Sequence, residues 1–312
     1  MTVGNFDLVS ICMVTFNHES FIKKAIDGVL LQKCNFEIEL IISDDASTDQ
    51  TEIIIRDIIN TSNQGYLIKY FRQEINIGMQ SNGLFVLNRV RGKYIALCDG
   101  DDYWIDPYKL QKQYDFLEGN PDYLLCAHRI KELRGDEFFS ILNEKIEYKF
   151  LDFSVTGSCN GVYTSSMMFR NTPIILDVFL SDWTLNLDGG DHLILLLSTV
   201  NGHKIKLLND VMGVYRIHNG GVWSSSTIEK KVKDAIFTNK SYIYNLNLSK
   251  IQKNQIKFGL TRLILQFYSA RIKNKFLRKS ISISLKIAFF TGPGFISNWL
   301  INFFSNRILS KT

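Results

Sequence analysis

The chain has 312 residues, of which 46% are hydrophobic and 21% charged. This composition is typical of one large globular domain or two smaller ones, and it excludes disorder over most of the length. Four prolines and twenty glycines exclude a collagen-like or linker-rich chain. The net charge of +5 is uneven: the segment from Glu229 to the end has sixteen Lys and Arg against two acids, whereas residues 1–228 have 20 against 29.

The five cysteines form no CxxC pair. Three of them, Cys12, Cys98 and Cys126, lie in apolar runs, which favours buried free thiols in a reducing compartment over a disulfide framework. The N-terminus lacks the basic-then-apolar pattern of a signal peptide, and no apolar run reaches the length of about 18 residues that predicts a transmembrane helix. We therefore expect a cytoplasmic protein without a membrane span.

The first hundred residues alternate between two kinds of pattern. Apolar, β-branched runs predict strands, and apolar residues at helical spacing predict the helices between them. The predicted strands are Leu8–Val14, Glu37–Ser43, Tyr66–Phe71 and Lys93–Cys98. The predicted helices are a segment from Glu19 to Leu30, a segment capped by Ser47 or Asp49 that runs to Ile59, and Gln80–Arg89. This alternation predicts an α/β fold with a mostly parallel sheet covered by helices on both faces.

From Trp104 to about Ser226, the sequence mixes short strand and helix patterns with less regular alternation. From Thr227 onward, the pattern is helical. Ile281–Phe290 and Phe295–Leu309 are apolar segments that are too short to span a bilayer. They suit either interfacial helices or helices packed on the body. The basic tail likewise suits either a solvated surface or contact with anionic lipid, and no nucleic-acid motif accompanies its charge.

Three polar clusters directly follow predicted strands: Thr15–His18, Asp44–Asp49 and Asp99–Trp104. In open parallel sheets, ligands bind beyond the carboxyl ends of the strands. We therefore expect the three clusters to meet at one ligand site.

The last cluster has three acids, Asp99, Asp101 and Asp102, within four residues. Like charges this close need a cation or strong donors, and a hard divalent metal with phosphate oxygens fits them. The alternative is a helix N-terminus, where the dipole favours acids. An EF-hand is excluded because Tyr103 and Leu110 occupy ligand positions. A dinucleotide fingerprint is excluded because the first loop lacks GxGxxG.

The paired acids Asp44 and Asp45 follow the second predicted strand. A capped turn explains Ser47 and Asp49 but does not need both preceding acids. A carboxylate at a strand end accepts hydrogen bonds from ribose hydroxyls or a base N–H. This pair therefore points to a nucleoside.

Six motifs follow one another within residues 7–226: Thr15-Phe16-Asn17, DDASTDQT at 44–51, Asn76-Ile77-Gly78, GKYIALCDGDD at 92–102, GGD at 189–191 and VYRIHNGGVWS at 214–224. In this order, they resemble the motifs of the inverting family 2 glycosyltransferases with the GT-A fold, of the non-processive type found in bacterial polysaccharide and O-antigen assembly. Processive synthases are set apart by an Arg-Trp motif and membrane spans that this sequence lacks.

The resemblance implies a role for each matching residue. The implied nucleotide-sugar contacts are Thr15, Asn17, Asp44, Asp45, Arg72, Asp99, Gly100 and Arg216. The implied ligands of Mn²⁺ or Mg²⁺ are Asp99, Asp101 and His218. Asp191 matches the catalytic base, although the family's usual Glu-Asp is Gly190-Asp191 here. Trp104 and Trp223 are candidates for stacking on sugar.

The resemblance implies a GT-A domain over residues 1–226, with a nucleotide-binding half up to about residue 104 and an acceptor half from about 105. Residues 227–312 form the basic, amphipathic helical extension. The expected enzyme uses a UDP-sugar donor and an acceptor saccharide linked to undecaprenyl diphosphate, peripherally at the cytoplasmic face of the bacterial membrane. The alternatives are a carbohydrate- or membrane-binding protein with an inactive transferase fold and a sugar nucleotidyltransferase. The latter is disfavoured because the loop after the first strand has neither glycine nor a cation.

Overall fold

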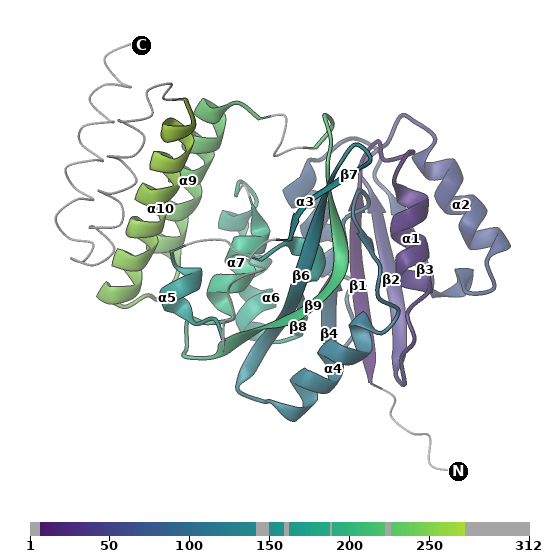
Figure 1. The fold of residues 1–312 in the computed structure, drawn as a ribbon, viewed down its shortest axis with the longest axis horizontal. Coiled ribbons are helices and arrows are strands. Elements are labelled where there is room, and N and C mark those ends of the chain that lie inside the picture. Colours follow the sequence, from purple (N-terminus) through teal and green to yellow (C-terminus); the bar gives the residue numbers. More distant parts are fainter. Residues whose placement is uncertain (1–6, 142–149, 159–161, 188, 222–225, 272–312) are drawn as a thin grey trace. The chain divides into compact units, whose positions relative to one another are not determined.

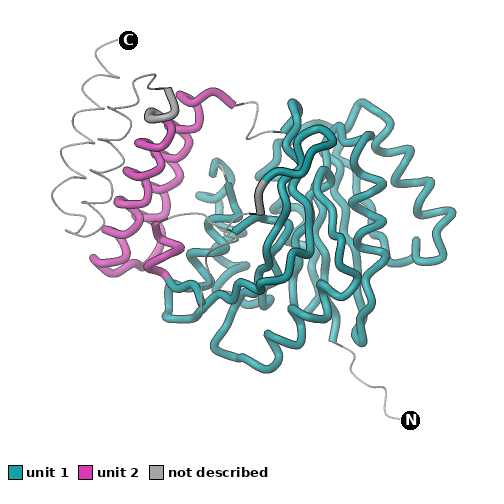
Figure 2. Tube along the Cα trace, in the orientation of Figure 1, with its two compact units in different colours: residues 1–152, 161–221 teal, residues 153–160, 222–312 magenta. Residues whose placement is uncertain are grey.

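A computed structural model describes residues 7–141, 150–158, 162–187, 189–221 and 226–271. The chain divides into two compact units, drawn in different colours in Figure 2. Unit 1 consists of residues 1–152 and 161–221, and unit 2 of residues 153–160 and 222–312.

One mixed sheet of nine strands runs through the described part of unit 1 (Figure 1). Its strands are β1 (Leu8–Thr15), β2 (Glu37–Asp44), β3 (Ile68–Arg72), β4 (Tyr94–Leu97), β5 (Tyr103–Trp104), β6 (Tyr123–Arg134), β7 (Glu137–Ile141), β8 (Met168–Arg170) and β9 (Lys204–Ile217). Their order is β3-β2-β1-β4-β8-β6-β9-β5, with β7 paired to β6.

The strands β3, β2, β1 and β4 are parallel to their neighbours. The chain moves outward from β1 to β3 and then returns to the other side of β1 to form β4. The strand order therefore reverses between β1 and β4, and the carboxyl ends of strands at such a reversal are where open α/β sheets bind ligands.

Helices cover both faces of this parallel part. Alternate residues of β1, namely Val9, Ile11 and Met13, share one buried cluster with residues of three helices, α1 (Ile22–Leu30), α2 (Thr51–Thr61) and α4 (Lys109–Gly119). The opposite face carries α3 (Met79–Leu87), where Ser43 Oγ donates to Asn82 Oδ1 at 2.6 Å. Each fully buried apolar side chain stabilises the fold by about 1.5–3 kcal/mol.

The remaining strands extend the sheet on the β4 side. β8 is antiparallel to both β4 and β6, β6 is parallel to β9, and β5 is antiparallel to β9. The last pairing aligns Tyr103 with Val214, so the residues at the end of β9 lie beside the acidic cluster that precedes β5. The other helices of unit 1 are α6 (Pro173–Phe179), α7 (Gly190–Leu197) and the 3-10 helices η1 (Gly65–Leu67), η2 (Thr164–Ser166) and η3 (Asp182–Thr184).

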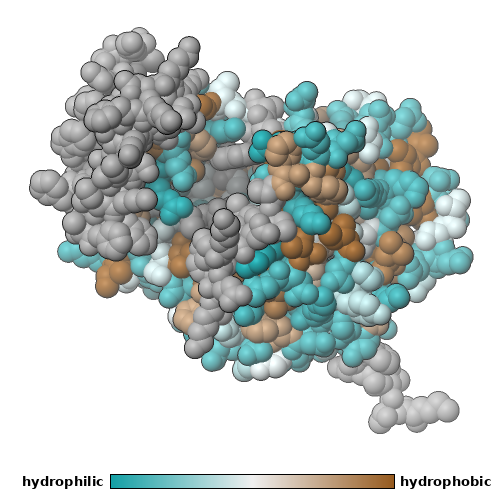
Figure 3. All heavy atoms as spheres, viewed as in Figure 1, coloured by the Kyte–Doolittle hydropathy of each residue, from teal (hydrophilic) through white to brown (hydrophobic). Residues whose placement is uncertain are grey.

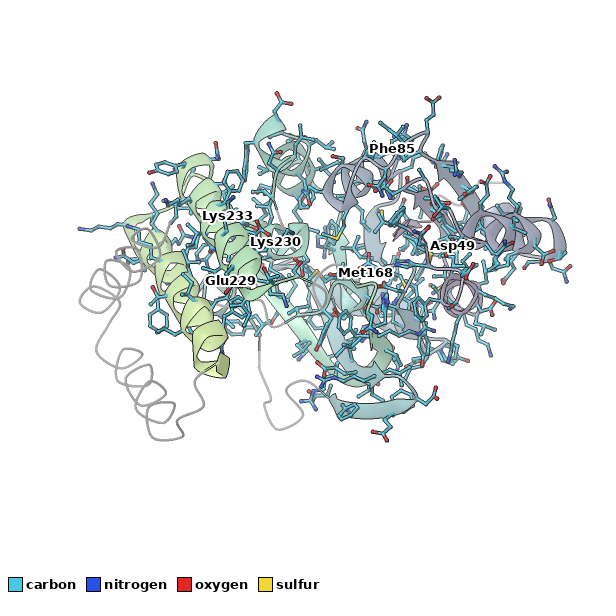
Figure 4. All side chains as sticks on the ribbon, turned by 90° about the horizontal axis from the view of Figure 1, so that it is seen from above. Asp49, Phe85, Met168, Glu229, Lys230 and Lys233 are labelled. Carbon is cyan, nitrogen blue, oxygen red and sulfur yellow. The ribbon has the colours of Figure 1, made fainter. Side chains whose placement is uncertain are left out.

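Unit 2 contains α5 (Phe153–Thr156), α9 (Ile228–Asn245) and α10 (Lys250–Arg271). The Thr227 hydroxyl caps α9 by accepting from the Lys230 N–H. Lys230 and Lys233, labelled in Figure 4, are exposed on this helix. No helix in the described residues is long and apolar enough to cross a membrane. The predicted apolar segments 281–290 and 295–309 lie outside the described residues.

The predicted α/β architecture is confirmed, with boundaries that shift by a few residues. The third strand begins at Ile68 rather than Tyr66, because the preceding residues form the turn η1. The helix predicted after Asp44-Asp45 begins at Thr51, whose N–H donates to Asp49 Oδ1 at 3.0 Å. Cys12, Cys98 and Cys126 are buried free thiols, as predicted.

The prediction that Trp104 stacks on sugar is wrong. Its side chain is 3% exposed, its indole N–H donates to the Ser165 carbonyl at 2.7 Å, and Lys109 Nζ lies 3.7 Å from the ring centroid. The residue is therefore part of the core beneath the site, and Trp223 lies outside the described residues.

On the face drawn in Figure 3, the hydrophobic side chains occur in small groups among hydrophilic ones.

Candidate functional site

The three polar clusters predicted at strand ends meet at one edge of the sheet. Thr15 and Asp44 are paired at the last register position of β1 and β2. Beyond β4, the chain continues along β1, because the Cys98 N–H donates to the Cys12 carbonyl at 3.0 Å and the Gly100 N–H to the Val14 carbonyl at 2.9 Å. This continuation brings the acidic cluster beside the loop that follows β1.

The Asp44–Asp45 turn is held by donors of the protein itself. Asp44 is fully buried and accepts from the Ser47 N–H at 2.8 Å and the Tyr70 hydroxyl at 2.9 Å. Asp45 is 3% exposed and accepts from the backbone N–H groups of Ile77 at 2.7 Å and Gly78 at 2.9 Å. These bonds tie β2 to the loop before α3. The predicted contacts of both acids with the nucleotide-sugar stay predictions.

Asn17 and Arg72 brace the same turn. Asn17 has a left-handed backbone (φ 54°), which asparagine tolerates, and its Oδ1 accepts from the Thr48 N–H at 2.8 Å. Arg72 donates to the Ser47 carbonyl at 3.0 Å and forms an ion pair with Glu52 at 2.9 Å. Both residues thus border the predicted nucleoside site.

The acidic cluster has unequal members. Asp102 is buried and accepts from the Arg216 N–H at 3.0 Å. Burial, together with the charges of Asp101 and Asp191, raises the pKa of the partly exposed Asp99 to about 8. Burial also opposes the charge of Asp101, but the hydrogen bond from His218 and the nearby His18 hold its pKa below the usual value. Asp101 is therefore the carboxylate best prepared to carry a negative charge.

Arg216 and His218 extend from the end of β9 over this cluster. His218 Nε2 lies 3.1 Å from Asp101 Oδ2. Arg216 donates to the Asp101 carbonyl, and its guanidinium lies 4.4 Å from the Tyr103 ring centroid. The Arg216 cation is thus held by a backbone oxygen and a ring face, close to the acids.

His18 also lies in this site, in the loop predicted there, although the sequence indicated no role for its side chain. Its Nε2 is 3.9 Å from Asp101 Oδ2, and its Nδ1 is 3.1 Å from Thr15 Oγ1. Desolvation by burial lowers its pKa despite the charge of Asp101, which favours the neutral imidazole. The only signal in the sequence was its position directly after Asn17, in a loop already expected at the site.

Asp191 lies in the first turn of α7, which follows the left-handed Gly189 (φ 83°). Its Oδ2 is 3.5 Å from Thr164 Oγ1, and its charge contributes to the raised pKa of Asp99. The residue is partly exposed, and its predicted role as the catalytic base stays a prediction. The structure therefore brings Asp191 close to the acids that follow β4.

The glycine that departs from the family's usual Glu-Asp has a steric reason. A Cβ at Gly190 would lie 2.6 Å from Phe179 Cζ and 3.1 Å from Gln80 Oε1. In this chain, Phe179 of α6 fills the space in which a longer side chain would begin.

One group among the described residues could hold a metal ion, and it consists of His18, Asp101 and His218. One potential ligand atom from each residue lies within 4.8 Å of the other two. Imidazole nitrogen and carboxylate oxygen are both ligands of divalent first-row metals, so these residues fit such an ion. Asp99, predicted as a ligand, is not in this group.

The sequence profile described as "Glycosyl transferase family 2" matches residues 10–175. The chain belongs to this family. The match includes the Asp44–Asp45 turn and the acidic cluster and ends before Asp191. The predicted family is therefore confirmed.

Three proteins illustrate what the chain is similar to. An uncharacterized protein of Mycobacterium tuberculosis is 34% identical over 229 residues, which are 72% of this chain and 62% of the relative. The Escherichia coli UDP-Glc:alpha-D-GlcNAc-diphosphoundecaprenol beta-1,3-glucosyltransferase WfaP is 28% identical over 69% of this chain and 80% of that protein. Staphylococcus aureus TarS, solved with UDP-GlcNAc, has a TM-score of 0.66 and 19% identity over 94% of this chain and 83% of TarS.

The chain thus matches less than two thirds of the length of the mycobacterial relative. The likeness to TarS concerns the fold, and it confirms the GT-A arrangement of the sheet and its helices.

Proposed function

We propose that this protein is a metal-dependent inverting glycosyltransferase. It moves a sugar from a UDP-sugar to a hydroxyl of a saccharide linked to a lipid diphosphate, of the undecaprenyl-diphosphate GlcNAc type, in bacterial surface polysaccharide synthesis. The observation that carries the proposal is the meeting of Asp99, Asp101, Asp191, Arg216 and His218 at the carboxyl edge of the parallel strands. The UDP-containing substrates in the names of WfaP and the TarS structure support the choice of donor.

Asp191 acts as the general base in this proposal. Inverting transfer needs one carboxylate to take the proton of the acceptor hydroxyl while its oxygen attacks the anomeric carbon and the bond to the UDP oxygen breaks. Asp191 is partly exposed and lies at the start of α7, where the helix dipole favours a negative charge. No covalent intermediate is required.

Arg216 and the cation-binding residues stabilise the leaving group. A divalent cation bound by Asp101 and His218 would supply positive charge to the departing diphosphate. Arg216, fixed over Tyr103, adds a second positive charge at the same place. In this proposal, the nucleoside and ribose are bordered by Asp44, Asp45, Asn17, Arg72 and the backbone at Gly100.

The proposed acceptor is linked to a lipid, and the proposed location is the membrane surface. WfaP acts, according to its name, on a diphosphoundecaprenol-linked GlcNAc. The exposed Lys230 and Lys233 on α9, followed by a Lys- and Arg-rich segment, favour contact with an anionic membrane surface. Vesicle co-sedimentation of the full chain and of a Lys230→Gln/Lys233→Gln variant tests this contact, and equal binding would argue against α9 as the surface involved.

The first experiment measures UDP release from a panel of UDP-sugars, with GlcNAc-diphosphate-lipid analogues as acceptors, in Mn²⁺ and in EDTA. Release from one donor that stops in EDTA is the expected result. Release that persists in EDTA contradicts the metal dependence. Normal UDP binding without turnover on any pair indicates an inactive transferase fold, and release of pyrophosphate from UTP and a sugar phosphate indicates a nucleotidyltransferase.

A further inference from the structure

We infer that His18 is a third protein ligand of the divalent cation, together with Asp101 and His218, and that this set selects Mn²⁺ over Mg²⁺. The inference deepens the proposed function and rests on it, since it concerns the cation of the same site.

Both histidine nitrogens lie at ligand-to-ligand distances from Asp101, and all three ligand atoms lie within 4.8 Å of one another. Asp101 Oδ2 is 3.1 Å from His218 Nε2 and 3.9 Å from His18 Nε2. With metal–ligand bonds of about 2.0–2.2 Å, two ligands of one cation lie between about 3 Å and slightly over 4 Å apart. The two rings approach Asp101 from different elements, the loop after β1 and the end of β9, and are nearly perpendicular, with an interplanar angle of 82°.

Thr15 orients the His18 ring. Its Oγ1 is 3.1 Å from Nδ1, and the side chain is 2% exposed, which fixes the hydroxyl in place. When Nδ1 carries the proton and donates it to this hydroxyl, Nε2 keeps its lone pair and faces Asp101. Metal-binding histidines have this arrangement, in which a partner at one ring nitrogen fixes the tautomer that ligates through the other.

Gly100 leaves room for this pair. A Cβ at this position would lie 2.8 Å from Thr15 Oγ1 and 3.0 Å from His18 Nδ1. The turn between Asp99 and Asp101 therefore packs directly against the hydrogen bond that orients His18. Any side chain at position 100 would displace the bond.

The donor set favours one class of cation. Mg²⁺ prefers oxygen ligands and keeps several waters, whereas Mn²⁺ shares the preference for carboxylates but, as a transition-metal ion, binds imidazole nitrogen more readily than Mg²⁺ does. Two imidazoles and one carboxylate hence favour Mn²⁺ over Mg²⁺, and the remaining positions stay open to diphosphate oxygens. Asp99, outside the group, is left to contact the sugar nucleotide.

The test is direct binding of Mn²⁺ and Mg²⁺ to the EDTA-treated, desalted full chain, followed by electron paramagnetic resonance and calorimetry without any sugar donor. His18→Gln should weaken Mn²⁺ binding by about 10- to 100-fold and change Mg²⁺ binding little. The nitrogen couplings of bound Mn²⁺ should fall from those of two imidazoles to those of one. His203→Gln, at the residue before β9, is the matched control and should bind like the parent chain.

A second pair of variants tests the positioning role of Thr15. Thr15→Val removes the partner of Nδ1 with little change in shape and should weaken Mn²⁺ binding about tenfold, whereas Thr15→Ser keeps the hydroxyl and should restore it.

Unchanged Mn²⁺ affinity in His18→Gln, with loss of binding in Asp101→Asn, would overturn the assignment of His18 and leave the proposed function standing. His18-dependent Mn²⁺ binding without UDP release from any donor would instead contradict the proposed function alone.

Discussion

Two acidic turns flank the end of β1, and they differ in whether the protein itself supplies hydrogen-bond donors to the carboxylates. In the turn after β2, four donors of the protein satisfy the carboxylates of Asp44 and Asp45. In the turn after β4, Asp99, Asp101 and Asp102 raise one another's energy, and burial raises the pKa of Asp99 to about 8. The first turn is held by donors of the protein itself, whereas we propose that the second gains stability from a bound cation. The sequence alone therefore does not show which neighbouring acids are satisfied by donors of the protein and which of them bind a ligand.

The largest effect is expected at the base beside the second turn. Asp191→Asn keeps the shape of the side chain but cannot accept the proton, so turnover should fall by about 10²- to 10⁴-fold. Binding of UDP and Mn²⁺ should change little, because Asp191 is not in the cation group. Steady-state kinetics and calorimetry measure the two properties.

Asp182→Asn is the matched control for this variant, since Asp182 is an exposed acid of the nearby helix η3. Activity in Asp191→Asn equal to that of this control would remove Asp191 from the reaction.

The next largest effect that distinguishes the two turns is the pH dependence of stability. The pKa of Asp99 is 3.8 in model compounds and about 8 in the fold, so between pH 4 and pH 8 the folded chain keeps a proton that the unfolded chain releases. Its contribution to stability therefore decreases as the pH rises through this window, by at most ~1.4 kcal/mol per pH unit for one proton. Because Asp99 is partly exposed, solvent screening reduces the total loss.

Thermal melts of the metal-free chain should show this slope, and Asp99→Asn should flatten it and raise the melting temperature at pH 8. Mn²⁺ should stabilise the parent chain more at pH 8 than at pH 5. The exposed Asp57→Asn variant is the control. A slope that is unchanged in Asp99→Asn would mean that other groups cause it.

Removing a carboxylate from the first turn is expected to lower the stability of the fold, in contrast to Asp99→Asn in the second turn. Asp44→Asn leaves a buried amide N–H₂ where the turn offers donors, so the free energy of unfolding should drop by about 1–3 kcal/mol. Denaturant titration at pH 7 measures the drop. A stabilised Asp44→Asn would place Asp44 in the same class as Asp99 and end the contrast between the turns.

The sequence predicted the sheet well because strand and helix patterns in residues 8–98 are local. It also predicted which loops would meet, since parallel strands end at one edge. It could not predict that Tyr70 and Ile77 supply the donors of Asp44 and Asp45, because both come from later segments of the chain. The sequence indicated no role for the His18 side chain, and Trp104 was misassigned, for the same reason: the direction of an aromatic ring depends on contacts such as those with Thr15 and Ser165, which no spacing encodes.

The smallest effect tests how far the first turn depends on a single donor. Tyr70→Phe removes one of the two hydrogen bonds to Asp44 and keeps the ring, so it should cost about 0.5–1.5 kcal/mol of unfolding free energy. The loss should nearly vanish in the Asp44→Asn background if the Tyr70 hydroxyl acts through the carboxylate. A full, additive loss in the double variant would instead mean that the ring position matters and that the turn is held mainly by the backbone N–H of Ser47.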